Sequence, residues 1–173
     1  MKYRQLLKQS KAQLNNKPVY IDQPFTMHIF SHGAKWMSEQ LNNNASNTFN
    51  PNINFDGYGI LKYGICIMAT IAVALLLWQL NIFLTPLALL VFYFCEVHFL
   101  FLFPLLIDKI EQPLIESIRQ TYNIGIFSCM ATVIPISIFM ITGLMNIKHP
   151  FKNWHTGSLA IIIWYKDEVR SRL

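Results

Sequence analysis

The stretch IFLTPLALLVFYFCEVHFLFLFPLLI, residues 82–107, decides the fold class of this chain. It is an almost unbroken run of Leu, Phe, Val and Ile, and about 20 helical residues cross a hydrocarbon core of ~30 Å. The run is therefore long enough to span a bilayer as a tilted helix. Its only charged or readily protonated side chains are Glu96 and His98, near the middle of the run.

Two further apolar blocks flank this run, at residues 60–78 and 124–145. Both fall within the length range of a spanning helix. The chain of 173 residues is 53% hydrophobic and only 13% charged, a composition typical of integral membrane proteins. We expect an all-α integral membrane protein with about three transmembrane helices, in a membrane domain over residues 59–145.

The segments outside the membrane domain are polar or amphipathic. Residues 1–58 form an N-terminal arm, in which apolar side chains at helical spacing predict an amphipathic helix of about 18 residues after Pro24. An Asn-rich linker follows over residues 42–54. Residues 146–173 form a basic tail, whose apolar run 159–165 is too short to cross a bilayer. We expect helices at the membrane interface near both ends of the chain.

The connections between the blocks are short. Only Gln79-Leu80-Asn81 separates the first two blocks, which predicts a tight antiparallel hairpin. Trp78 at this turn suits a position at the membrane–water interface. Between the second and third blocks, residues 108–123 predict a surface-lying connector helix that starts at Pro113 or just before it.

Glu96 and His98 are the first candidate functional residues. A charge at the bilayer centre costs at least about 2.5–3.5 kcal/mol on insertion scales, so each group should have a partner. Two positions apart on a helix, they point in nearly opposite directions and cannot form one intrahelical pair. We expect desolvation to keep Glu96 protonated and hydrogen-bonded to a hydroxyl group of Thr70, Ser128 or Thr132. A purely structural Glu96, which joins helices, is the alternative.

Small and weakly polar residues form a stripe along the third block. Gly125, Ser128, Thr132 and Pro135 recur at spacings of 3, 4 and 3 and therefore share one helix face. Because membrane helices pack through small side chains, the stripe is expected to receive the helix that carries Glu96 or another protein. Pro135 is expected to kink the helix.

No cofactor or metal site is predicted. The three cysteines lie one in each apolar block, without a short metal-ligand spacing. His28 and His32 have helical i,i+4 spacing but no matching acidic or thiol residue. A haem-binding protein would use His98 as an axial ligand, and a partner subunit would have to supply the second histidine, because the other histidines lie outside the blocks.

The positions of the basic residues disagree with the topology that three membrane crossings would give. The net charge of +5 is concentrated at both ends of the chain, which favours anionic lipid headgroups over nucleic acid as partners. Three crossings place two basic ends on opposite sides, against the positive-inside rule. A re-entrant third block, broken at Pro135, would place both ends together. We expect three ordinary crossings and a cytoplasmic N-terminus, because residues 1–58, before the first block, carry six basic side chains and no secretory signal.

Three classes of function fit this pattern. The first is a non-enzymatic membrane protein that binds or blocks a larger membrane machine, which agrees with the absence of a catalytic motif and with the small-residue stripe. The second is a membrane-anchor subunit of a respiratory complex, with His98 on a haem or Glu96 near a quinone. The third is a proton-coupled carrier built on Glu96, for which the internal repeats usual in transporters are missing.

The overall plan resembles that of small plasmid-encoded inner-membrane proteins of the colicin-immunity and conjugative entry-exclusion types. The resemblance rests on the three blocks over residues 60–145 and on an Asn- and Ile-rich composition suggestive of an AT-rich gene. It implies a place in the bacterial inner membrane and another membrane protein or complex as partner. The same intramembrane faces could also join copies of the chain into a homo-oligomer. No functional residue is carried over from these families.

Overall fold

The computed structural model describes residues 2–16, 28–42, 50–145 and 151–173. Within these ranges the backbone is helical almost throughout and contains no strand. Three of the segments described are long and apolar enough to cross a membrane, namely Phe55–Leu80, Ile82–Ile107 and Ile126–Gly143. The predicted fold class, an all-α protein with three helices of membrane-spanning length, is confirmed.

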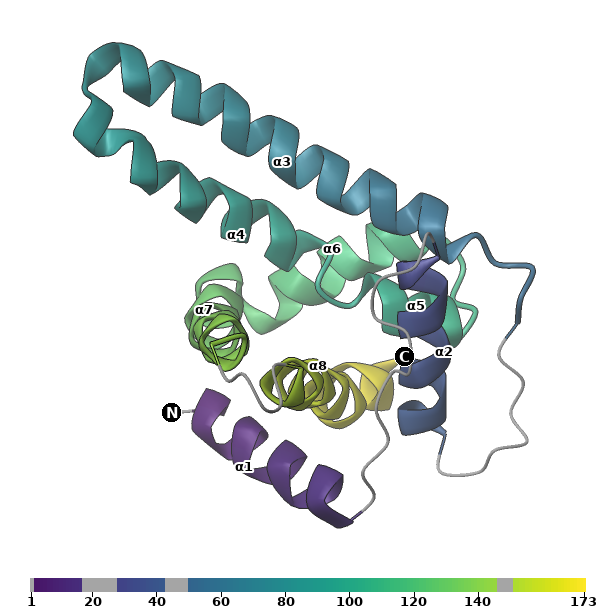
Figure 1. Ribbon diagram of the computed structural model, residues 1–173. Coiled ribbons are helices and arrows are strands. Elements are labelled where there is room, and N and C mark those ends of the chain that lie inside the picture. Colours follow the sequence, from purple (N-terminus) through teal and green to yellow (C-terminus); the bar gives the residue numbers. More distant parts are fainter. Residues whose placement is uncertain (1, 17–27, 43–49, 146–150) are drawn as a thin grey trace.

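Helices α3 (Phe55–Leu80) and α4 (Ala88–His98) form an antiparallel hairpin that projects from the rest of the molecule (Figure 1). The turn contains a short 3-10 helix, η1 (Ile82–Leu87). Asn81 stabilises the start of this helix because its side-chain oxygen accepts a hydrogen bond of 2.9 Å from the backbone N–H of Phe83. The first two apolar blocks therefore pack as the tight hairpin that their short connection requires.

The second apolar block is not one straight helix. Helix α4 ends at His98, residues 99–101 form a turn, and the chain resumes as α5 (Leu102–Ile107). Pro104 favours this interruption, because it has no N–H to donate and its ring clashes with the carbonyl four residues earlier. The membrane block predicted over residues 82–107 is thus divided, and Glu96 lies near the end of a helix rather than at its middle.

Side chains of α6 (Pro113–Ile124) stabilise the interrupted end of α4. The Thr121 hydroxyl donates a hydrogen bond of 2.7 Å to the Val97 carbonyl, and the Ser117 hydroxyl donates one of 2.9 Å to the His98 carbonyl. Carbonyl groups at the end of a helix lack their regular partners within it, and these hydroxyls add hydrogen bonds there, although the Val97 carbonyl also accepts one of 3.3 Å from the Leu100 N–H. The connector helix starts with proline, as predicted.

Gly125 joins α6 to α7 (Ile126–Gly143). Its φ angle of +99° lies in the region that favours glycine, so the direct connection between the two helices depends on this residue. Helix α7 continues through Pro135 without an interruption. The third block is therefore a single helix, shorter than the predicted range 124–145.

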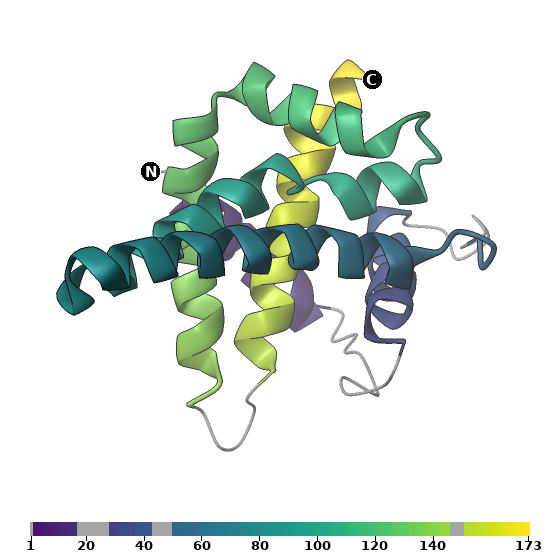
Figure 2. The ribbon, with the colours of Figure 1, turned by 90° about the horizontal axis from the view of Figure 1, so that it is seen from above.

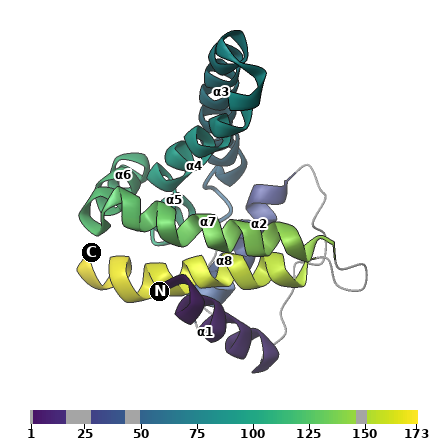
Figure 3. The same cartoon turned by 90° about the vertical axis from the view of Figure 1, so that its left-hand side faces the viewer.

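Helix α8 (Lys152–Trp164) lies at the centre of the molecule, between α7 on one side and α1 and α2 on the other (Figures 1 and 3). The helical path continues through a π-helical turn, Tyr165–Val169, and a last 3-10 turn. Leu159 and Trp164 are fully buried. The predicted interfacial tail over residues 146–173 therefore differs from the structure, in which its described part, residues 151–173, forms the core helix.

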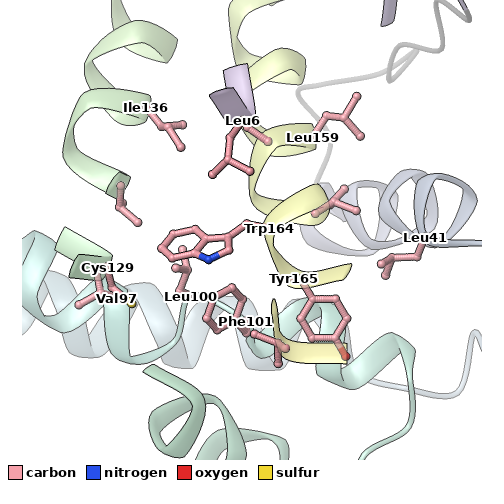
Figure 4. Packing of buried hydrophobic residues seen from close by; sticks show 14 of the residues in the cluster. Leu6, Leu41, Val97, Leu100, Phe101, Cys129, Ile136, Leu159, Trp164 and Tyr165 are labelled. Atoms are coloured by element: carbon pink, nitrogen blue, oxygen red, sulfur yellow. The ribbon is translucent and has the colours of Figure 1, made fainter. Parts of the chain in front are cut away.

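The packing around Trp164 explains why the tail is buried. The Phe101 ring meets the Trp164 indole edge to face, with ring centroids 5.5 Å apart, and Leu6 and Ile136 belong to the same cluster (Figure 4). Gly157 lets α8 approach α7 closely, because a Cβ atom at this position would lie 2.3 Å from the Met140 Cγ atom. An apolar helix buried by protein on most sides needs no membrane surface to cover it.

Helices α1 (Lys2–Asn16) and α2 (Ile29–Leu41) pack on this core. Leu6 and Leu14 of α1 and Leu41 of α2 are almost completely buried. Helix α2 is the amphipathic helix predicted after Pro24, and the apolar faces of both N-terminal helices are covered by protein. Residues 17–27 and 43–49, which include part of the predicted helix start and most of the Asn-rich linker, lie outside the described residues.

Helices α7 and α8 run side by side and lie across the direction of the α3–α4 hairpin (Figure 2). The hairpin extends beyond the edge of the body formed by the other helices (Figures 1 and 2). The three segments of membrane-spanning length therefore do not form one parallel bundle.

Candidate functional site

An ion pair connects the two legs of the hairpin. The Lys62 Nζ atom of α3 lies 3.9 Å from the Glu96 Oε1 atom of α4, and the two side chains are 6% and 18% exposed. This distance is too long for a direct hydrogen bond, so the contact is electrostatic. The Lys62 ammonium group also lies 5.1 Å from the centre of the Tyr63 ring. The partner of Glu96 is therefore a lysine on the neighbouring leg.

Two of the three hydroxyl groups predicted to bond Glu96 donate within their own helices. The Thr70 hydroxyl donates a 2.7 Å hydrogen bond to the Cys66 carbonyl of its own helix. The Thr132 hydroxyl likewise donates a 2.9 Å bond to the Ser128 carbonyl. The predicted hydrogen bond from Glu96 to one of these hydroxyls is replaced by the contact with Lys62.

Lys62 is the functional candidate that the sequence interpretation missed. The signal was present, since Lys62 is the only Lys, Arg, Asp, Glu or His in the first apolar block, residues 60–78. A lysine in such a segment calls for a partner for the same reason as Glu96 does. The two charges face each other because α3 and α4 are antiparallel and joined by a short turn.

The ion pair lies at one end of the hairpin, and the part of the hairpin beyond it carries no charges. Residues 63–95 contain no Lys, Arg, Asp, Glu or His. At 1.5 Å per helical residue, the path from Lys62 to Leu80 is about 27 Å long, close to the ~30 Å of a hydrocarbon core. In a membrane-inserted hairpin, Lys62 and Glu96 therefore lie near one interface and the turn lies near the other.

The hairpin exposes an unusual amount of apolar surface. Leu76, Phe83 and Leu90 are 61%, 86% and 52% exposed. Many other large side chains of the hairpin are exposed as well: Ile60, Leu61, Ile65, Ile67, Met68, Ile71, Leu75, Trp78, Leu80, Ile82, Leu84, Leu87, Leu89 and Phe94. A patch of this extent is typical of a surface that meets lipid or another protein.

His98 contacts a different helix from Glu96. Its Nδ1 atom lies 2.7 Å from the Phe94 carbonyl oxygen, and its Nε2 atom lies 3.5 Å from the Tyr122 hydroxyl of α6. The His98 ring also packs edge to face against the rings of Phe94 and Tyr122. In the described part of the chain, no group of three or more His, Cys, Asp or Glu residues is placed to hold a metal ion.

The predicted small-residue stripe does not form one contact surface. Gly125 occupies the turn before α7, Ser128 is exposed, Thr132 is 4% exposed and Pro135 is half-buried. The contact between α4 and α7 instead uses larger residues of the core cluster, among them Val97, Cys129 and Val133. The helix that carries Glu96 therefore packs on α7, but not through the stripe as a whole.

A polar cluster outside the membrane-length helices joins distant segments. Asp108, just after α5, accepts hydrogen bonds of 2.8 Å from the Tyr165 hydroxyl and 2.9 Å from Arg170 Nη2. Burial, together with the hydrogen bond to Asp108, raises the pKa of the Tyr165 phenol far above its usual value. Arg170 also donates to the Leu41 carbonyl at 3.3 Å. This cluster links the ends of α2, α5 and α8.

A second polar contact holds the two ends of the chain together. The Lys2 ammonium group lies 2.5 Å from Glu168 Oε1 and 4.4 Å from the centre of the Trp164 ring. Burial opposes ionisation of Glu168, but the hydrogen bonds from Lys2 and Trp164 outweigh it and hold the pKa of this carboxyl below its usual value. The sequence gives no local signal for either polar cluster, since their members are far apart in the chain.

No family model, no curated protein and no solved structure matches this chain.

Proposed function

We propose that this chain is a non-enzymatic membrane protein that binds or blocks a larger membrane machine, of the immunity or entry-exclusion type. The observation that carries the proposal is the α3–α4 hairpin, which is free of charges over residues 63–95 and exposes apolar side chains along both legs. The Lys62–Glu96 contact holds the legs together at the base of the hairpin. A hairpin of this kind presents a preformed surface within the membrane.

The outer surface of α3 supports contact with a further helix. A methyl group placed on Gly64 would meet no atom within 4 Å, so the helix backbone is open to approach at this point. The exposed side chains of Ile65 and Met68 lie beside it along the helix. Helices in lipid associate where small residues permit close packing, so a helix of a partner can pack here.

The proposed location is the inner membrane of a bacterium, with the N-terminus in the cytoplasm. The three apolar helices support membrane insertion. The basic residues of α1, which include Arg4, Lys8 and Lys11, support the cytoplasmic side, where Lys and Arg are in excess.

The two other functions gain no specific support from the geometry. His98 Nε2, the atom that a haem iron would need, is directed at the Tyr122 hydroxyl. Glu96, the residue on which a proton-coupled carrier would depend, is engaged with Lys62. Both groups are therefore explained by contacts within the chain.

The test is protection of a bacterial host that expresses the chain. We expect lower killing by one member of a panel of pore-forming bacteriocins, or a lower frequency of incoming conjugation. Gly64→Leu, which fills the open position on α3, should abolish protection while the protein stays in the membrane. Gly33→Leu is the matched control, because Gly33 of α2 also has no atom within 4 Å but lies outside the hairpin.

A second experiment, photo-cross-linking, identifies the partner directly. A photoreactive residue at Met68, which is 70% exposed on α3, is expected to form a covalent product with one membrane protein. The same residue at Ile115 of α6, which is 54% exposed, is the control outside the hairpin. No protection in any challenge, together with no protein cross-linked from Met68, would reject the proposal.

A further inference from the structure

Helix α7 is flanked along its length by a charged helix. Helix α1 packs on both α7 and α8, and the Lys11 ammonium group lies 4.8 Å from the centre of the Phe139 ring of α7. The Lys2 ammonium group, near the other end of α1, contacts Glu168 beyond the end of α8. Helix α1 therefore places charged side chains beside the middle of the α7–α8 pair as well as near its ends.

The outer face of α1 is basic and exposed. Arg4, Lys8 and Lys11 recur at spacings of 4 and 3, so they share one side of the helix, and all three are exposed. Leu6 and Leu14 bind another side of α1 to the core. If α7 crossed a bilayer with α1 packed beside it, these cations would lie in hydrocarbon, where Lys and Arg are rare and costly.

The direction of α7 leads to the same conclusion. Helices α7 and α8 lie across the direction of the α3–α4 hairpin (Figures 2 and 3). Two segments that lie across each other cannot both follow the membrane normal. The hairpin fits the hydrocarbon core, because its backbone is helical and its residues 63–95 carry no charged side chain.

We infer that only the α3–α4 hairpin crosses the bilayer, while α7 lies along the headgroup boundary on the side of the body. Phe127, Ile138 and Ile141, which are exposed on α7, then meet the acyl chains. The occupant of this surface is a bilayer with anionic headgroups, because the basic α1 lies beside α7. The two ends of the chain lie on the same side.

This arrangement removes the conflict between the charges and the topology. Two crossings place both basic ends together, as the positive-inside rule favours, whereas three crossings separate them. Pro135 need not break α7, since the helix never has to turn back within lipid. The inference concerns how the chain sits in the membrane and does not depend on which machine it binds.

The test compares the two ends of α7 in the full-length protein in its membrane. Asn123→Cys and Met145→Cys introduce thiols at exposed positions just before α7 and just after it. A maleimide that cannot cross membranes is applied to sealed vesicles of known orientation. The three native cysteines are buried or half-buried, so the unsubstituted chain gives the background labelling.

We expect both positions, at the two ends of α7, to be labelled from the same side as Arg4→Cys on α1. Leu80→Cys at the hairpin turn, where Leu80 is 76% exposed, should be labelled only from the opposite side. Labelling of Asn123→Cys and Met145→Cys from opposite sides would overturn the inference, as would protection of both from both sides. Either result would leave the proposed binding function to be judged by the protection assay.

Discussion

Lys62 Nζ and Glu96 Oε1 lie 3.9 Å apart at the base of the α3–α4 hairpin, and both side chains are largely buried. The contact fixes the register of the two legs, because a shift of one helical turn would move one charge about 5 Å along the axis past the other. It also marks the boundary between the charge-free residues 63–95 and the body of the molecule. The proposed insertion of the hairpin in the membrane depends on this boundary.

Removing one member of this pair should destabilise the protein. Lys62→Met leaves Glu96 without its counter-charge, and breaking a buried ion pair in this way costs about 3–5 kcal/mol. The free energy of unfolding in detergent micelles, followed by circular dichroism, is the measurement. The double variant Lys62→Met with Glu96→Leu should recover much of the loss, since no unpaired charge remains. A double variant less stable than either single variant would show that the pair is not coupled.

The interruption of α4 should depend on the Thr121 hydroxyl. Thr121→Val removes one hydrogen bond to the buried Val97 carbonyl, which keeps a longer bond from the Leu100 N–H, and the loss of one such bond costs about 0.5–1.5 kcal/mol. Thr142→Val is the matched control, because the exposed Thr142 hydroxyl bonds a carbonyl of its own helix, and its effect should stay within about 0.5 kcal/mol. Equal losses in the two variants, measured by chemical unfolding, would contradict this role.

Asp108 should stabilise the contact between distant segments. Asp108→Asn weakens the hydrogen bonds to Tyr165 and Arg170, and hydrogen bonds to a charged group contribute about 1.5–3 kcal/mol. Limited proteolysis should then cleave the C-terminal segment sooner than in the wild type. Asp167→Asn, at an exposed position nearby, is the control and should leave the cleavage rate unchanged.

His155 should make the stability depend on pH. Burial lowers the pKa of His155 below 6.5, against a hydrogen bond with the Phe151 carbonyl that raises it. The unfolded chain therefore takes up a proton at higher pH than the folded one. This contribution to stability is fully present above about pH 6.5 and is lost as the pH falls from there through the folded-state pKa.

The measurement is the unfolding temperature between pH 7.5 and 5. We expect a decrease below pH 6.5 in the wild type and a smaller one in His155→Gln. His32→Gln, at an exposed residue of α2, should behave as the wild type. An identical pH profile for wild type and His155→Gln would contradict the assignment.

The sequence predicts three helices of membrane-spanning length, because uninterrupted runs of Leu, Ile, Phe and Val as long as these are rare in other structures. It also predicts the hairpin from Gln79-Leu80-Asn81 and the connector from Pro113. The 3-10 geometry of η1 could not be read from it. With about 2.0 Å of rise per residue in η1 against 1.5 Å in a regular helix, the path from Ile82 to Glu96 is about 24 Å, close to the length of the other leg.

The burial of α8 is the other feature that local sequence does not reveal. Its apolar run over residues 159–165 is too short to cross a bilayer, and this suggests a surface anchor. The structure instead covers the run with α1, α2 and α7, through contacts between residues more than a hundred positions apart. Such long-range packing is set by the whole chain, so periodicity within one segment cannot predict it.

The most direct test of the account is alkaline carbonate extraction of membranes from cells that express the chain. If the α3–α4 hairpin lies in hydrocarbon, the wild type stays in the membrane pellet. A variant with Leu76→Asp and Leu90→Asp, which places a carboxylate on each exposed leg, moves largely to the soluble fraction. Release of the wild-type chain by carbonate, or no difference between it and the variant, would contradict insertion of the hairpin.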